Sequence, residues 1–202
     1  MSTETSDTPS KVPLWRNPFG PLMMLPFLLV WLIAIFAPLN ILDLCPSCDS
    51  LSNSVRRAIT DLAPFVDIQA FARSTTFPQV AFFVSALYWA LLPVMGFLHL
   101  VSLHIGIRES RWMQWKIVRS GYPEVFLIDF IKAAGGLLLF TFSAYAATAL
   151  PGGWSLFGGF GTTNRLVLVI IFGPIFFMIA LHIGVIYALI RALVHFNILN
   201  RE

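Results

Sequence analysis

Four long apolar segments, separated by short polar and charged stretches, dominate the pattern along this chain of 202 residues. They cover approximately residues 21–42, 79–107, 125–150 and 165–190. Each is long enough for a helix that crosses the hydrocarbon core of a bilayer, which takes about 20 apolar residues. The pattern therefore predicts an all-α, polytopic membrane protein with four transmembrane helices.

Composition supports a single membrane domain. The chain is 57% hydrophobic and only 11% charged, whereas soluble domains carry about 25% charged residues. We therefore expect residues 18–202 to form one four-span helix bundle, without a separate soluble catalytic domain. Residues 1–17 are polar and interrupted by proline, and they lack the basic start and apolar core of a cleavable signal peptide. They are predicted to be a disordered cytoplasmic tail.

The distribution of basic residues predicts the orientation, because cytoplasmic loops carry an excess of Lys and Arg. With the tail inside, the cytoplasmic side carries Lys11, Arg16, Arg108, Arg111, Lys116, Arg119, Arg191 and Arg201. The outer side carries Arg56, Arg57, Arg73 and Arg165, with Asp43, Asp49, Asp61 and Asp67 among them. We expect a multi-pass protein of the bacterial inner (plasma) membrane with both termini in the cytoplasm. The net charge of +3 reflects this bias, and no nucleic-acid partner is expected.

The first predicted outer loop, residues 43–78, contains an amphipathic pattern. Apolar residues recur with the spacing of one helical face at Leu51, Val55, Ile59 and Leu62. The opposite side carries Arg56, Arg57, Thr60 and Asp61, and Pro64 ends the pattern. We expect a helix that lies flat in the outer interface, either as a lid over the bundle or as a surface for a partner.

Two further features suit contact with other helices or proteins. Small residues in the third span, including Gly135, Gly136, Ala144 and Ala147, allow helix backbones to approach closely. The second predicted outer loop, 151–164, is rich in glycine and is either a flexible linker or a docking site. The candidate partner contacts are Leu51, Val55, Arg56, Arg57, Ile59, Leu62, Trp154, Phe157 and Phe160.

The chain's two cysteines, Cys45 and Cys48, form a Cys-Pro-Ser-Cys motif just after the first predicted span. Such a pair closes into a disulfide in an oxidising compartment or acts as a redox centre when neighbouring groups lower the thiol pKa. The motif and the span count resemble the quinone-linked disulfide oxidases of the inner membrane, which implies a thiol relay. That family carries a second cysteine pair in its other outer loop, and residues 151–164 contain none. We therefore expect a structural disulfide.

Two histidines lie at matched positions in the second and fourth spans. His99 and His182 each precede an arginine, Arg108 or Arg191, by nine residues. If the two helices run in the same direction, the imidazoles lie at one depth, as a b-type haem between two helices requires. Hydrogen-bonded bundle histidines or a proton relay explain the same residues. We favour hydrogen-bonded histidines and expect no cofactor and no metal, because two cysteines alone cannot complete a tetrahedral zinc site.

Signatures of enzymes and transporters are absent from the sequence. There is no serine-nucleophile, P-loop or HExxH motif, and the first, second and fourth spans contain no acidic residue of the kind that marks ion paths. We expect a non-catalytic protein whose partners are membrane lipid and another membrane-embedded protein. The layout is similar to that of four-span immunity proteins against pore-forming colicins, which implies neutralisation of a membrane-depolarising toxin. The alternative is a small subunit of a redox complex, with haem at His99 and His182 or a thiol relay at Cys45 and Cys48.

Overall fold

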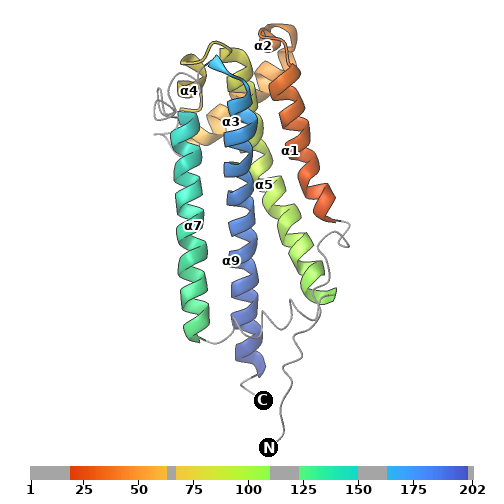
Figure 1. Cartoon of the computed structure of the whole chain (residues 1–202), viewed down its shortest axis with the longest axis vertical. Coiled ribbons are helices and arrows are strands. Elements are labelled where there is room, and N and C mark those ends of the chain that lie inside the picture. The colour runs from red at the N-terminus through yellow and green to blue at the C-terminus, as the bar shows by residue number, and fades with distance from the viewer. Residues whose placement is uncertain (1–18, 63–66, 110–122, 150–162, 200–202) are drawn as a thin grey trace, which may run out of the picture.

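The computed structural model describes residues 19–62, 67–109, 123–149 and 163–199 (Figure 1). Within these ranges all regular secondary structure is helical, and three helices are long and apolar enough to cross a membrane. The prediction of an all-α chain with membrane-spanning helices is thus confirmed at this level. The predicted tail, residues 1–17, and the candidate contacts Trp154, Phe157 and Phe160 lie outside the described residues.

The three long apolar helices occupy the second, third and fourth predicted segments. They are α5 (Pro78–Glu109), α7 (Pro123–Ala149) and α9 (Gly173–Leu199), and a π-helical turn, η3 (Leu168–Phe172), leads directly into α9. Both α5 and α7 begin with proline, whose fixed φ suits the first helical position and whose missing N–H is not needed there. α5 also continues without a break through Pro93.

Helix α1 covers Phe19–Phe36, and it is shorter than the predicted first segment. The expected apolar run extended to residue 42, but the helix ends at Phe36 because Pro38 lacks an N–H and disfavours helical geometry at the residue before it. A separate short helix, α2 (Ile41–Leu44), follows. The 18 residues of α1 rise by roughly 27 Å at 1.5 Å per residue, close to the thickness of a hydrocarbon core.

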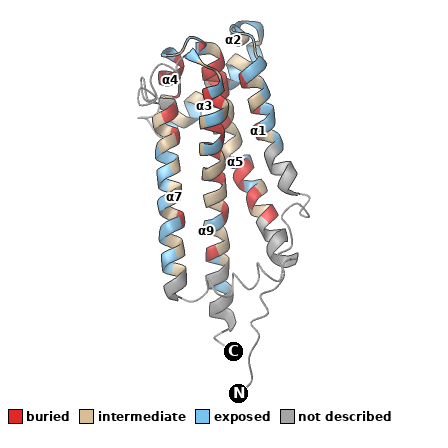
Figure 2. Ribbon diagram, in the orientation of Figure 1, coloured by how far each residue is buried: buried red, intermediate tan, exposed pale blue. Residues whose placement is uncertain are grey.

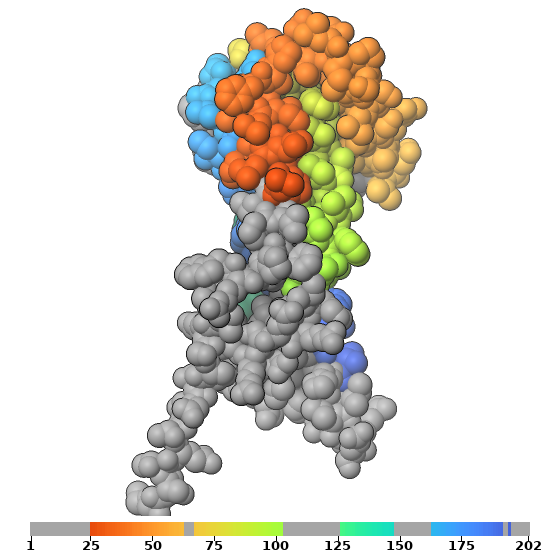
Figure 3. Space-filling model, turned by 90° about the vertical axis from the view of Figure 1, so that its right-hand side faces the viewer, coloured from red at the N-terminus to blue at the C-terminus, as the bar shows by residue number. Residues whose placement is uncertain are grey.

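The long helices alternate in direction and pack in a row (Figure 1). α7 packs on α9, α9 on α5, and α5 on α1. α5 and α9 therefore run in the same direction, whereas α7 and α1 lie at opposite ends of the row. Figure 3 shows α1 (red) and α5 (green) side by side below the orange segment that includes α2 and α3.

Short helices gather at one end of the bundle and form a cap, a name used below for residues 41–62 and 67–73. Besides α2, the cap contains α3 (Pro46–Leu62) and α4 (Gln69–Arg73). All three contact α5, and α4 also contacts α7. The cap lies at the end opposite to that at which α1 and α7 begin (Figure 1). That the cap lies on the outer side of the membrane stays a prediction.

Aromatic side chains fill the core beneath the cap. The Tyr88 ring stacks on Phe176 at a centroid distance of 5.0 Å, and its hydroxyl donates to the Leu168 carbonyl in η3 at 2.8 Å. The π turn lies just before Pro174, which has no N–H to complete a regular helical ladder. The Tyr88 bond thus fastens α5 to the irregular start of α9.

Arg165 joins the end of α1 to the start of η3. Its Nη1 donates to the carbonyl of Ala37 at 2.6 Å and to that of Ile35 at 3.4 Å. The last carbonyls of a helix have no partner within the helix, so a cation that bonds them acts as a C-cap. The interaction joins α1 to the bundle through two residues, Ala37 and Arg165, that are 128 positions apart in the sequence.

Candidate functional site

Polar side chains hold the cap to the bundle in a fixed orientation. Gln79, in the first turn of α5, accepts from the Leu42 N–H at 3.0 Å and donates from Nε2 to Asp43 at 2.9 Å. Arg56 Nη1 donates to Gln69 Oε1 at 3.0 Å and so links α3 to α4. These bonds connect α2 to α5 and α3 to α4.

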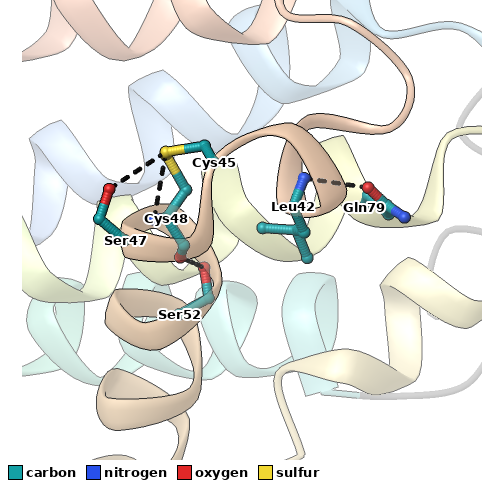
Figure 4. The surroundings of a disulfide bond; sticks show 6 residues. All are labelled: Leu42, Cys45, Ser47, Cys48, Ser52 and Gln79. Carbon is teal, nitrogen blue, oxygen red and sulfur yellow. Dashed lines mark hydrogen bonds between the residues drawn. A yellow bond between two sulfur atoms is a disulfide. The ribbon is translucent and has the colours of Figure 1, made fainter.

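The predicted disulfide is present between α2 and α3 (Figure 4). The sulfur atoms of Cys45 and Cys48 are 2.10 Å apart, and the two Cα atoms are 5.2 Å apart. Cys45 immediately follows α2, and Cys48 lies in the first turn of α3. Both side chains are half-buried.

The sulfur of Cys45 occupies the N-cap position of α3. The Cys48 N–H donates to it at 3.2 Å and to the Cys45 carbonyl at 2.9 Å. The Ser47 hydroxyl donates to the sulfur at 3.3 Å, since a disulfide sulfur carries no hydrogen. Pro46 fills the first helical position, where no donor is required. The sulfur therefore takes the place of the side-chain oxygen that caps most helices.

The packed face of α3 is rotated relative to the predicted one. Val55 and Ile59 pack against the core, as the pattern suggested, and Ser52 beside them is fully buried. Leu51 and Leu62 are 43% and 88% exposed, so they form an apolar flank beside the packed stripe. Of the predicted polar side, Arg57 is exposed and Arg56 is half-buried against α4.

His182 lies in the interface between α9 and α7. Its Nδ1 is 2.7 Å from the Met178 carbonyl, which can only accept, so Nδ1 carries the proton. The other side of the ring covers Gly136, where an added Cβ would lie 2.2 Å from Nε2. Phe140 of α7 also contacts the ring, with centroids 5.4 Å apart. The imidazole is therefore directed at α7.

His99 is buried on α5, but it is not level with His182. Gly96 of α5 faces Ile183 of α9, whose Cδ1 would lie 3.8 Å from an added Cβ. His99 follows Gly96 by three residues, whereas His182 precedes Ile183 by one. On two helices that run in the same direction, His99 therefore lies further along α5 than His182 lies along α9. The structure therefore does not bring these histidines together around one plane.

The outward face of α7 is an exposed apolar surface, and it contains Gly135 but not the other small residues that the sequence interpretation grouped with it, because Gly136 is covered by His182 and Ala144 and Ala147 are buried. Only 6% of its most apolar stretch is buried, against 56% for α5, and Figure 2 shows pale blue along the helix. Gly135 lies at the centre of this face with no atom within 4 Å of an added Cβ. The large residues around it, spaced three and four apart, are Ile128, Ile131, Leu138, Leu139 and Phe142. We call these residues with Gly135 the α7 face.

A cavity of about 220 Å³ lies where α2, α4 and α5 meet. Its lining comprises Leu42, Gln69, Ala72, Arg73, Pro78, Gln79 and Phe82. Its polar side chains already bond within the cap, because Gln69 accepts from Arg56, Arg73 pairs with Asp67, and Gln79 holds α2. The lining comes from three helices, so no single sequence motif marks this cavity.

Comparisons with known proteins add no family. A scan against protein-family models and searches of curated proteins and of solved structures found no match to this chain. Within the described residues, no group of three or more His, Cys, Asp or Glu side chains is placed to hold a metal ion. The described residues thus present an exposed apolar face on α7, a cap that is hydrogen-bonded to the bundle, and a disulfide at the N-terminus of α3.

Proposed function

We propose that this protein is a four-span protein of the bacterial inner membrane that works by non-catalytic contact with a membrane-embedded partner. The more specific proposal is an immunity protein that neutralises a pore-forming toxin. Membrane lipid and the toxin's hydrophobic helices are then its two partners. Both termini face the cytoplasm, and the cap faces the outside.

Two observations support α1 as the fourth span and the cap as the outer end. α1 packs along α5 and is tied to η3 through Arg165, so it belongs to the same row as the three long helices. The cap contains Arg56, Arg57 and Arg73 together with acidic Asp43, Asp49, Asp61 and Asp67. Such mixed charge is typical of the outer side, because excess Lys and Arg are retained in the cytoplasm.

Labelling of single cysteines tests this orientation. In a Cys45→Ser, Cys48→Ser background, Thr60→Cys on the exposed side of α3 is expected to react with a membrane-impermeant maleimide in intact spheroplasts. Val194→Cys, exposed near the other end of α9, should react only after the membrane is permeabilised. Labelling of Val194→Cys in sealed spheroplasts would contradict the orientation.

The observation that carries the contact function is the α7 face. Lipid tails are as apolar as leucine, so helices associate in membranes through close packing. Gly135 leaves a notch in the middle of a helix face with large residues on both sides, and a partner helix can approach the backbone there. By contrast, Gly136 is already covered by His182. Gly136 therefore serves packing within the bundle, whereas Gly135 is available to a partner helix.

The geometry of this face suits a partner that inserts helices into the same bilayer. α7 contains 27 residues, which rise by about 40 Å and so extend through the hydrocarbon core. A toxin helix docked along it would be held away from its pore-forming arrangement. The rigid cap stands at the face from which such a toxin enters, and the exposed Leu51 and Leu62 lie there.

A survival assay with one altered residue tests the proposal. Cells that produce the chain are challenged with purified pore-forming toxins, and membrane potential is followed with a voltage-sensitive dye. We expect the cells to stay polarised against the cognate toxin, and Gly135→Leu to reduce protection by at least about tenfold in toxin dose, the loss of roughly 1.4 kcal/mol of helix packing.

The matched control for this assay is Ile170→Leu, which changes an exposed apolar residue of η3 away from α7. It should protect as well as the parent chain. All variants are compared at equal amounts in the membrane. Depolarisation by every toxin of a broad panel, or full protection by Gly135→Leu, would refute the proposal.

A further inference from the structure

We infer that the Cys45–Cys48 disulfide is a thiol-exchange site that accepts electrons from a protein dithiol on the cap side of the membrane. Cys45 is the sulfur that forms the mixed disulfide with the partner and then leaves as a thiolate. The inference does not depend on the proposed contact function, because it concerns the chemistry of the cap alone.

The position of Cys45 stabilises a thiolate. In the disulfide its sulfur accepts from the Ser47 hydroxyl and shares the Cys48 N–H with the Cys45 carbonyl. Hydrogen bonds to a charged acceptor are about twice as strong as neutral ones, so these donors stabilise a Cys45 thiolate more than the disulfide. It also lies at the positive end of α3, a helix of 17 residues. Both effects favour the reduced, charged form more than the disulfide.

Acidic neighbours only partly oppose this effect. Asp43 is turned towards α5 by its bond from Gln79. Asp49 lies in the first turn of α3, and its carboxylate accepts from Asn53 Nδ2 at 2.9 Å. Each carboxylate is engaged by an amide donor, whereas the Ser47 hydroxyl donates to the Cys45 sulfur itself.

A partner can reach the disulfide. Cys45 and Cys48 are half-buried, and the adjoining Leu44, Pro46 and Ser47 are exposed. Because these neighbours are exposed, a dithiol on a flexible segment of the partner can approach the disulfide from their side. Figure 4 shows the two sulfurs at the turn that joins the two helices.

The reaction is a balanced two-electron exchange. One thiolate of the partner attacks Cys45 Sγ, the Cys45–Cys48 bond breaks, and Cys48 leaves and takes up a proton. The second partner thiolate then attacks the partner sulfur of the mixed disulfide and expels Cys45 as the thiolate that the helix end stabilises. The partner loses two electrons and two thiol protons, and the chain gains two electrons.

The cap does not depend on this disulfide for its position. α2 is held by Gln79, and α3 is held by the packing of Val55 and Ile59 and by the bond from Arg56 to Gln69. A bridge between residues three apart also closes a very short loop, for which the loss of unfolded-state entropy is smallest. Reduction can therefore occur without loss of the site.

The first test is a redox equilibrium of the purified full chain in detergent with glutathione. We expect glutathione to reduce the disulfide, and Ser47→Ala to lower the equilibrium constant for reduction by about threefold to tenfold, the effect of one hydrogen bond. Ser54→Ala is the matched control, since its hydroxyl bonds only the Ser50 carbonyl of its own helix. A disulfide that resists excess glutathione and yields only to dithiothreitol would overturn the inference, as would equal effects of the two variants.

The second test separates the cysteines. The pH dependence of alkylation by iodoacetamide is measured for Cys45 in Cys48→Ser and for Cys48 in Cys45→Ser. The pKa of the Cys45 thiol should lie below that of Cys48 and below about 8.5, the value of a free cysteine. Circular dichroism checks that both variants keep their helices. A Cys45 pKa at or above that of Cys48 would contradict the assignment of Cys45 as the leaving thiolate.

Discussion

Replacing Gly136 with alanine is expected to lower the free energy of unfolding by about 3 kcal/mol, near the upper end for overpacking of a tight interface. The added Cβ would lie 2.2 Å from Nε2 of His182, so the ring or the helix has to move. The ring is fixed by its bond to the Met178 carbonyl and by Phe140. We therefore expect α7 and α9 to separate locally.

Gly135→Ala is the matched control for this substitution. The same chemical change one residue away meets no atom within 4 Å, so stability should stay unchanged or rise by up to about 1 kcal/mol, the gain of alanine over glycine inside a helix. Unfolding in detergent, followed by circular dichroism against denaturant, measures both. His182→Ala should relieve part of the Gly136→Ala defect, because residues in contact are not additive. Equal destabilisation by the two alanines would contradict the described register of α7 on α9.

Much of the helical architecture could be predicted from the sequence because length and apolarity determine it. The three long apolar helices follow from uninterrupted apolar runs, and Pro78 and Pro123 mark the starts of two of them. The end of α1 was placed too late because apolar residues continue past Phe36. Pro38 was the available signal, and it breaks the helix although the run remains apolar.

The contact surfaces were harder to predict, because they depend on which neighbour each helix meets. Gly135 and Gly136 are identical in the sequence, yet only Gly136 is covered by a side chain from another helix. The same difficulty applies to α3, where the amphipathic pattern identified Val55 and Ile59 but also included the exposed Leu62. A helical period gives the width of an apolar face, and tertiary packing decides which part of it is buried.

The two histidines illustrate the limits of sequence spacing. Equal distances from Arg108 and Arg191 suggested equal depth, but depth also depends on how far one helix is shifted along the other. The Gly96–Ile183 contact gives that shift, and no residue count contains it. The disulfide was predictable for the opposite reason, since a pair separated by three residues is brought together by local turn geometry alone.

Phe71→Ala is expected to have the largest effect on the cap, a loss of about 3–5 kcal/mol, as for other large-to-small changes at buried phenylalanines. Phe71 is fully buried, and its ring lies 5.2 Å from that of Phe172 in η3. It is the main side chain that inserts α4 into the aromatic core. The truncation leaves a void between the cap and the bundle, and it removes support from Ala72 and Arg73 in the wall of the cavity.

Phe97→Ala removes the same side chain from α5, where it is 64% exposed, and should be nearly neutral. The apparent Tm of Phe71→Ala should fall by roughly 10 °C, given shifts of about 2–4 °C per kcal/mol for chains of this size. Hydrogen exchange should show faster opening of α3 and α4 than of α7 and α9, since the cap loses its anchor while the long helices keep theirs. Similar Tm values for the two variants would mean that Phe71 does not anchor the cap, and the rigid outer platform proposed for toxin contact would lose its physical basis.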